Sequence, residues 1–250
     1  MRIIPLSEGA FTIDKTKRFV PFDLERDDLQ QRSTGSLLVE IQPFAIVTSE
    51  DVVVVDTGLG FRQDGVLQIH RNLAAAGIDP VKVTRVLLSH LHKDHAGGVS
   101  GDCFADAIPA SNRPLSFPNA QYYVQRRELE YAFEKGPTAY IPEELECLKH
   151  SPQVVLLDGD GVIDGYIKYE ITGAHCPWHQ AFWIVDGGET VFFGGDVAPQ
   201  LQQMKSRFVA KYDYDGKKAM EFRQRWWKQG QEEHWTFLFY HDVKTPIWRT

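Results

Sequence analysis

The sequence feature that most constrains this fold is a cluster of metal-binding side chains directly after a short apolar run. Residues 85–89 (RVLLS) predict a short buried strand, and four of the next six residues (HLHKDH) are good metal ligands. Alternate side chains of an extended segment share one face, so His90 and His92 reach one ion, and a following turn brings Asp94 and His95 to the same side. Taken alone, the cluster is also compatible with a solvated polar loop.

Three distant residues strengthen the metal interpretation, because each follows a predicted strand. They are His175 (YEITGAH), Asp196 (TVFFGGD) and His241 (FLFYH). Imidazole suits zinc, and carboxylates supply the negative charge that lets two dications lie close together. Five His and two Asp are enough for two ions, which roughly 3.5–4 Å apart would share a hydroxide with a lowered pKa and orient a carbonyl or phosphoryl oxygen.

The order of predicted elements indicates an α+β fold, a four-layer αββα sandwich in which two sheets pack face to face with helices outside. Strands are predicted at 36–48, 51–55, 85–89, 121–125, 154–157, 166–172, 181–185, 190–193 and 235–240, and a surface loop at 101–119. Helices are predicted after Asp64, which could cap the first of them, at 126–135, at 143–150, and between the cap Asp215 and the stop Gly230. We expect one domain over residues 1–250.

Composition argues against several classes of partner. The formal charge is -7 and no Lys/Arg block occurs, whereas a nucleic-acid-binding surface needs concentrated positive charge. No apolar run approaches the ~20 residues of a membrane span or forms a signal peptide, so we expect no membrane partner and a cytoplasmic location. Cys103, Cys147 and Cys176 form no C-x-x-C pair and are interpreted as small buried thiols.

These combined motifs resemble those of the metallo-β-lactamase superfamily, whose pattern is H-x-H-x-D-H followed by a distant His, Asp and His. The resemblance extends from Asp56-Thr57-Gly58 to His241-Asp242. It implies two metal sites joined by a shared aspartate. The first would be held by His90, His92 and His175, the second by Asp94, His95 and His241, with Asp196 bridging both.

Within that superfamily, the chain is most similar to the lactonase, esterase and phosphotriesterase-like branch. Asp196 stands where true β-lactamases carry Cys or Ser. Quorum-sensing lactonases place a Tyr three residues after the bridging Asp, where this sequence has Pro199. Tyr212 or Tyr214 would have to supply a phenol from a neighbouring loop, so the group that protonates the leaving group stays open.

Two further residues are expected beside the metal ligands rather than on the ions. His179 resembles the second His of the family's G-H-x-x-G-H segment and is expected to orient the site. Asp56 is expected to brace the ligand loop through hydrogen bonds.

The sequence therefore predicts a hydrolase that uses a metal-bridging hydroxide to cleave an ester-like bond of a small molecule, a lactone or carboxylic ester first. Asp94 and Asp196 are the predicted catalytic residues, and zinc is the expected metal, with Mn, Fe and Co as alternatives. Other substrates that stay open are phosphotriesters, phosphodiesters and thioesters. A mononuclear iron oxygenase of the persulfide dioxygenase type and a metal-stabilised binding protein are the rival classes. Nothing in the sequence specifies an oligomeric state.

Overall fold

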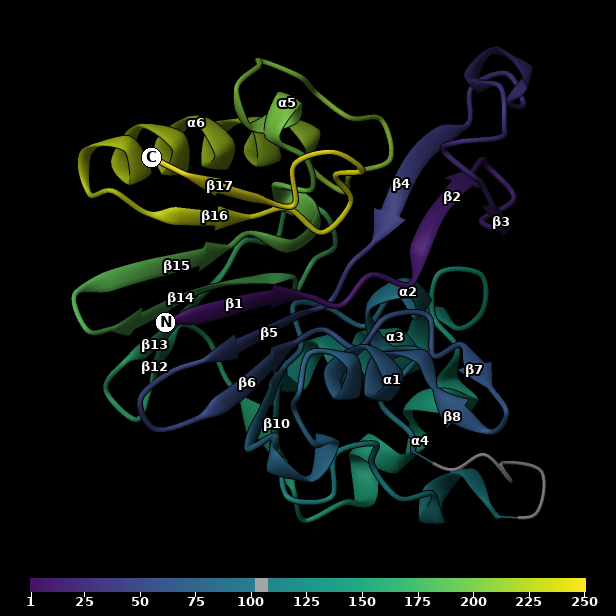
Figure 1. Ribbon diagram of the computed structural model, residues 1–250, viewed down its shortest axis with the longest axis vertical. Helices are drawn as coiled ribbons and strands as arrows, with labels where there is room; N and C mark the ends of the chain where they lie inside the picture. The colour runs from purple at the N-terminus through teal and green to yellow at the C-terminus, as the bar shows by residue number, and fades with distance from the viewer. Residues whose placement is uncertain (102–107) are drawn as a thin grey trace.

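Two six-stranded sheets packed face to face dominate the computed structural model, which describes residues 1–101 and 108–250 (Figure 1). The first sheet contains, in spatial order, β1 (Arg2–Pro5), β5 (Phe44–Val47), β6 (Val52–Val55), β9 (Arg85–Leu87), β10 (Gln121–Gln125) and β11 (Val154–Leu157). The second contains β12 (Gly161–Ile163), β13 (Ile167–Ile171), β14 (Gln180–Asp186), β15 (Glu189–Phe193), β16 (Thr236–Leu238) and β17 (Ile247–Arg249). Both sheets are mixed: β6, β9, β10 and β11 run parallel in the first, as do β15 and β16 in the second.

Smaller elements surround these sheets. A three-stranded sheet has the order β3 (Phe19–Pro21), β2 (Gly9–Ile13) and β4 (Leu37–Ile41), and a hairpin pairs β7 (Arg62–Gln63) with β8 (Val66–Leu67). The α-helices are α1 (Gln68–Ala75), α2 (Lys93–Ala96), α3 (Arg126–Lys135), α4 (Pro142–His150), α5 (Leu201–Met204) and α6 (Gly216–Glu232). Short 3-10 helices are η1 (Leu29–Gln31), η2 (Pro80–Lys82), η3 (Ala110–Asn112) and η4 (Gly195–Val197).

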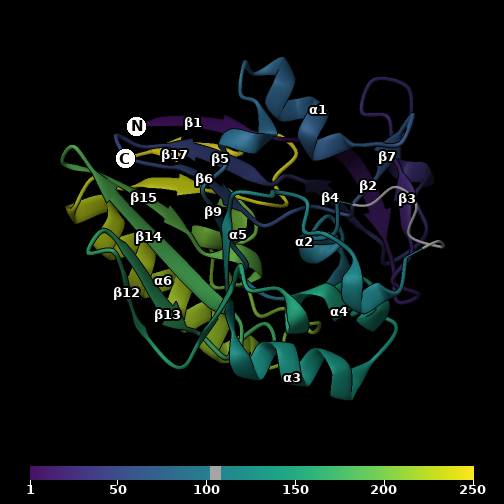
Figure 2. The same ribbon diagram turned by 90° about the horizontal axis from the view of Figure 1, so that it is seen from below.

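Three apolar cores define four layers. In β6, Val53 and Val55 pack between the two sheets, whereas Val54 points to the opposite face, as the alternation of a strand requires. That opposite face is covered by α1, α3 and α4, and the outer face of the second sheet is covered by α6 through Trp226 (Figure 2). The expected αββα architecture is confirmed.

The predicted strand at 36–48 is wrong in one respect, because the structure breaks it into β4 and β5 in different sheets. The break falls at Gln42-Pro43, where proline cannot donate a ladder hydrogen bond. The strands β1, β2 and β3 in the first 35 residues were not predicted, since each is only three to five residues long.

Two helix boundaries also differ from expectation. Asp64 does not cap α1: Asp64 and Gly65 have φ of 53° and 78° and form the two-residue turn between β7 and β8, a backbone that favours Asp-Gly. Gly230 does not end α6, which continues to Glu232. A Cβ at Gly230 would lie 2.2 Å from the Phe237 ring, so the glycine allows β16 to pack closely. The predicted cap Asp215 is confirmed, since its carboxylate accepts from the Lys218 amide.

Other expectations concern loops, thiols and membranes. Cys147 and Cys176 are buried free thiols, while Cys103 and part of the predicted loop 101–119 lie outside the described residues. Within the two described ranges, no helix combines the length and apolar character needed to cross a membrane.

Candidate metal centre

The first sheet delivers four of the predicted ligands at the end of β9. His90 follows β9 by three residues and is fully buried, and His92 keeps extended backbone angles (φ −60°, ψ 148°). The single turn of α2 then rotates Asp94 and His95 towards the same place. Because β9 lies between β6 and β10, this segment is held on both sides by neighbouring strands.

The second sheet delivers the other three ligands from the ends of its strands. His175 follows β13, Asp196 lies in η4 directly after β15, and His241 follows β16. A Cβ at Gly195 (φ +49°) would lie 2.5 Å from the Nε2 atom of His179. Glycine at this position therefore lets the Asp196 backbone approach His179.

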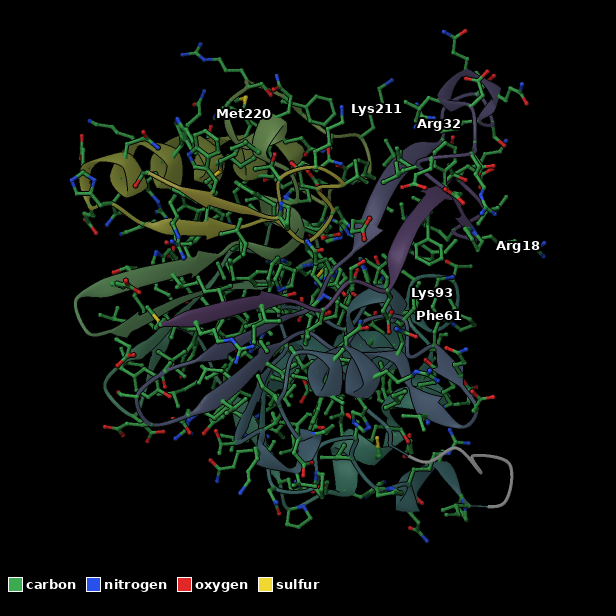
Figure 3. The ribbon with its side chains drawn as sticks, in the orientation of Figure 1. Arg18, Arg32, Phe61, Lys93, Lys211 and Met220 are labelled. Atoms are coloured by element: carbon green, nitrogen blue, oxygen red, sulfur yellow. The ribbon has the colours of Figure 1, made fainter. Side chains whose placement is uncertain are left out.

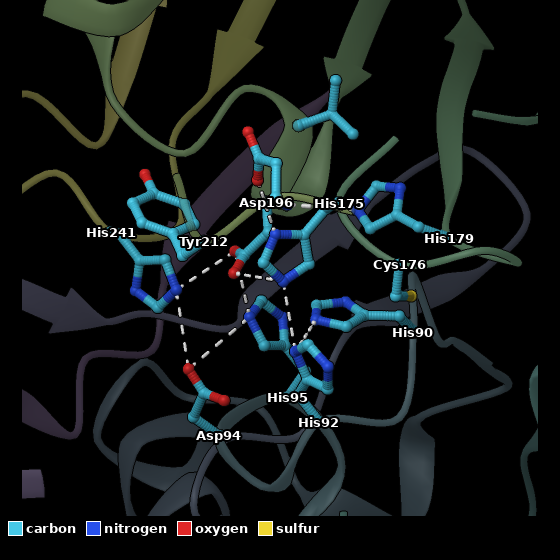
Figure 4. A network of polar contacts seen from close by, with 12 residues as sticks. His90, His92, Asp94, His95, His175, Cys176, His179, Asp196, Tyr212 and His241 are labelled. Atoms are coloured by element: carbon cyan, nitrogen blue, oxygen red, sulfur yellow. Dashed lines mark hydrogen bonds and ion pairs between the residues drawn. The ribbon is translucent and has the colours of Figure 1, made fainter. Parts of the chain in front are cut away.

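Three histidine nitrogens converge into a first set. The Nδ1 atom of His92 lies 3.0 Å from Nε2 of His90 and 3.1 Å from Nε2 of His175, as Figure 4 shows. Three tetrahedral ligands of zinc, each about 2.0 Å from the ion, would be separated by roughly 3.3 Å. The three nitrogens are thus spaced closely enough to share one ion.

A second set contains Asp94, His95 and His241. The Oδ2 atom of Asp94 lies 3.7 Å from Nε2 of His95 and 3.5 Å from Nε2 of His241. Two imidazoles and a carboxylate in this arrangement match the donor chemistry of a second divalent ion.

Asp196 connects the two sets through its two oxygens. Oδ1 lies 3.1 Å from Nε2 of both His95 and His241, and Oδ2 lies 3.3 Å from Nε2 of His175. Among the described residues, His95 Nε2 and Asp196 Oδ1 are both buried, and although they lie 3.1 Å apart, neither makes a well-aligned hydrogen bond. Buried polar atoms without partners are costly, and ions at the two sets would satisfy them.

Outer contacts fix which nitrogen faces inward in His95, His175 and His241. Asp56 lies 2.8 Å from Nδ1 of His95 and accepts from the Ser89 amide and hydroxyl. Nδ1 of His175 lies 2.9 Å from the carboxylate of Asp213, and Nδ1 of His241 lies 2.7 Å from a backbone carbonyl in β4. An imidazole that donates through Nδ1 leaves its Nε2 lone pair free for a metal.

His179 contacts the bridging residue without joining either set. Its Nε2 atom accepts from the Asp196 amide at 3.1 Å, and its Nδ1 atom lies 3.0 Å from the Thr172 hydroxyl. His179 therefore holds the backbone of Asp196 in place.

Electrostatics differ between the two sets. Burial and the neighbouring imidazoles hold the pKa of His90 and of His92 well below the usual value. Burial alone would lower the pKa of His95, but Asp196 and Asp94 outweigh it and raise that pKa well above its usual value. Burial would likewise raise the pKa of Asp196, but His241, His95 and His175 hold it well below its usual value. Asp196 is thus an anion at neutral pH.

The metal centre opens into a cavity of about 690 Å³. His92, Asp94, His175, Asp196 and His241 all line it, so a bound molecule would reach both ligand sets. Pro199, Gln200 and Tyr212 line its wall, and Tyr214 lines an adjoining cavity of about 370 Å³.

Sequence reasoning missed Asp213, whose side chain is only 1% exposed. It lies in the polar segment before α6, far from the motif, and nothing in its local pattern separates it from Asp215. The backbone carbonyl of Glu40 beside His241 was also missed, because carbonyl direction is set by the sheet and not by residue type.

Comparison with known proteins agrees with this architecture. The family model described as the metallo-beta-lactamase superfamily matches residues 40–241. The N-acyl homoserine lactonase AttM of Azorhizobium caulinodans is 34% identical over 117 residues, which are 44% of this chain and 39% of that protein. AttM of Agrobacterium fabrum is 33% identical over 121 residues, 45% of this chain and 40% of that protein. The match spans about two fifths of these relatives.

Solved structures show the same fold at low sequence identity. A "probable metal-dependent hydrolase" from Staphylococcus aureus has a TM-score of 0.78 and 20% identity, covering 99% of this chain and 91% of that one. The dizinc quorum-quenching lactonase AidC has a TM-score of 0.71 and 19% identity, covering 98% and 88%. The matching family model, the αββα layers and the histidine-aspartate clusters at the strand ends together show that this chain belongs to the metallo-beta-lactamase superfamily.

Proposed function

We propose that this protein is a metal-dependent hydrolase that cleaves an ester-like bond of a small molecule. The observation that carries the proposal is the position of Asp196, whose two oxygens face different sets of ligands at the floor of a large cavity. Two divalent ions held there, zinc first and Mn, Fe or Co as alternatives, would lower the pKa of a shared water and polarise a carbonyl oxygen.

The chain's own residues prepare this chemistry. His90, His92 and His175 would hold the first ion, and Asp94, His95 and His241 would hold the second. The negative charge of Asp196, which faces both sets, would offset the repulsion between the ions. We assign catalysis to Asp94 and Asp196, because both carboxylates reach the ions and line the cavity where the substrate would lie.

A lactone or carboxylic ester is the substrate class we place first. The curated relatives are N-acyl homoserine lactonases, and one solved structural neighbour is an N-acyl homoserine lactone hydrolase with the product N-hexanoyl-L-homoserine bound at its metal centre. Phosphotriesters, phosphodiesters and thioesters are second, because the same ligand set would orient their oxygens equally well.

The candidate groups for protonating the leaving group differ in their position relative to the cavity wall. Pro199 offers no donor. Tyr212 lies in the wall, with its ring centroid 6.2 Å from that of His175, and its hydroxyl lies 3.2 Å from the Gln203 side-chain amide. Burial raises the pKa of Tyr212 to about 12, so its phenol keeps its proton at neutral pH. Tyr214 is 69% exposed, so Tyr212 is the better placed phenol.

The two rival classes predict different metal content or activity. An iron oxygenase needs one ion, and it leaves the second set of Asp94, His95 and His241 without a role. A binding protein would hold metal without turnover.

A substrate panel tests the proposal directly. Metal-replete protein is assayed on lactones, aryl esters, thioesters, phosphotriesters and phosphodiesters, beside a sample stripped with a chelator and the same sample with zinc restored. We expect hydrolysis of a lactone or carboxylic ester that is lost on stripping and recovered with zinc. Metal-replete protein that hydrolyses none of the panel would overturn the proposal.

A further inference from the structure

The cavity above the metal centre is lined by an unusual excess of positive charge. Its cationic lining residues are Lys15, Lys17, Arg32, Lys93 and Lys211. Apart from the metal-centre residues Asp94 and Asp196, the only acid that the described residues contribute to the lining is Asp14. The whole chain has a formal charge of -7, so this local excess runs against its overall balance.

These cations come from separate parts of the chain. Lys15 and Lys17 lie between β2 and β3, and Arg32 follows η1 on the way to β4. Lys93 begins α2 beside the ligand Asp94, and Lys211 lies between α5 and α6 (Figure 3). Segments distant in sequence therefore bring positive charge to one cavity.

None of the five cations forms an ion pair with a carboxylate of the described residues. Arg32 donates to the Leu29 carbonyl at 3.0 Å, and Lys93 donates to the Lys17 carbonyl at 2.6 Å. Elsewhere, arginines of this chain do find acids: Arg85 lies 2.9 Å from Asp51.

The single acid does not offset this charge. Asp14 accepts from the Thr16 amide and hydroxyl, and these hydrogen bonds lower the pKa of its carboxyl, so it stays ionised. It is one half-buried negative charge against five cations, in a cleft whose low-dielectric walls concentrate the field.

The apolar part of the lining comes mainly from the three-stranded sheet. Ile13, Phe19, Leu37, Leu38 and Val39 contribute this surface. A molecule that fills the cavity would therefore place an apolar segment on β2 and β4 and meet cations around it.

We propose that the cavity selects a substrate with an anionic group, such as a carboxylate, sulfonate or phosphate, separated from the scissile ester by an apolar segment. Lys17, Arg32 and Lys211 are the specificity-determining residues. This inference rests on the proposed hydrolysis, because it names the class of molecule that the same site would cleave.

Two matched esters test the preference. One is 4-nitrophenyl butyrate, and the other is the same ester with a terminal sulfonate, a weak metal ligand. We expect metal-replete protein to show a kcat/KM at least about tenfold higher for the sulfonate at low salt, in the range of electrostatic steering, and the preference to shrink as salt screens the charges.

Charge-removing variants assign the preference to residues. Each of Lys17→Gln, Arg32→Gln and Lys211→Gln should reduce the ratio of the two kcat/KM values, by no more than about fivefold, the effect of one charge pair near 4 Å in water. The triple variant should abolish the preference. Lys228→Gln, which removes an exposed charge of α6 outside the cavity, should leave the ratio unchanged. Equal kcat/KM values for the two esters, or a preference that survives in the triple variant, would overturn the inference.

A binding measurement separates this inference from the hydrolase itself. The two matching 4-nitroanilides resist hydrolysis, so calorimetry reports their dissociation constants even if neither ester is cleaved. If the sulfonated anilide binds more tightly than the neutral anilide and the triple variant loses this difference, the anion site is supported independently of hydrolysis. No difference between the anilides, including no binding of either, would overturn it. Failure of both esters to react would bear only on the proposed hydrolysis, which the full substrate panel decides.

Discussion

We expect the proposed metal centre to depend most on Asp196, since its carboxylate faces both ligand sets. Removing its carboxylate leaves two dications a few ångströms apart without the charge that offsets their repulsion. We predict that Asp196→Ala lowers metal content and nearly abolishes hydrolysis, measured by elemental analysis and turnover on one preparation. Asp158→Ala, at an exposed partner of Arg126, is the matched control and should keep both. Full activity in the Asp196 variant would remove the two-ion model.

Pro199 supports a second prediction at the scale of single residues. Loss of one donor to a developing oxyanion costs roughly 10²–10³ in rate, so substrates with good leaving groups should suffer least. We predict that activated aryl esters or phosphotriesters are turned over at least as efficiently as long-chain acyl-homoserine lactones, compared by kcat/KM.

The adjacent phenol supplies the control for this comparison. If homoserine lactones win by two or more orders of magnitude and Tyr212→Phe removes that advantage, Tyr212 replaces the missing donor and the Pro199 prediction is wrong.

Site residues could be predicted from the sequence where their signal is local, and could not where their role depends on a tertiary contact. The ligand types and spacing of His90 to His95 are local, so the motif predicts their grouping directly. Asp213 acts only because the loop before α6 passes behind His175, a tertiary contact with no local signal. The cationic lining of the cavity could not be predicted from the sequence either, since its members come from four separate segments.

At the scale of elements, the close packing of the 57–60 loop against the end of α2 positions Asp94 and His95. A Cβ at Gly60 (φ +74°) would lie 2.2 Å from the Gly97 carbonyl oxygen. We predict that Gly60→Ala lowers the free energy of unfolding by about 1–3 kcal/mol, through overpacking and backbone strain, and weakens metal binding by about tenfold or more.

Gly77 offers a matched control for that variant. It has a similar φ of +78°, but no atom of the described residues lies within 4 Å of the position that a Cβ would take there. Gly77→Ala should therefore cost only backbone strain of about 1 kcal/mol and leave metal affinity unchanged. Equal metal affinity in the Gly60 variant and in the wild type would show that this packing does not position the ligands.

Strong β-branched runs such as residues 52–55 made most strands predictable from the sequence. Short strands in mixed polar sequence could not be predicted in this way. The Asp64-Gly65 turn shows the difficulty: Asp before an apolar helical pattern resembles a cap, yet Asp-Gly is also a hairpin turn, and only strand pairing decides between them.

At the scale of the whole molecule, the two sheets bring together ligands that belong to different halves of the chain. Burial would lower the pKa of His95 and of His241, but Asp196 and Asp94 outweigh it and raise both, so metal must displace protons there. These two histidines stay protonated to a higher pH than an ordinary imidazole, whose pKa is near 6.5. Metal affinity therefore falls as pH decreases through their raised pKa values.

We predict that activity at a fixed free zinc concentration decreases on the acid side, and that the midpoint moves to lower pH as free zinc increases. Acid also lowers the free energy of unfolding. The pKa of His90 and of His92 is lowered in the folded chain, so below about pH 6.5 the unfolded chain binds more protons than the folded chain does, and acid destabilises the fold. A profile that stays flat down to about pH 4, well below the ordinary imidazole pKa, would contradict the histidine ligands.

The most direct test of a two-ion hydrolase is a zinc titration of metal-free protein followed by hydrolysis of one responsive ester. Because Asp196 faces both ligand sets, full activity should require both ions. We predict that turnover rises to a plateau at two equivalents of zinc per chain. A plateau at one equivalent, or no hydrolysis at two, would contradict it.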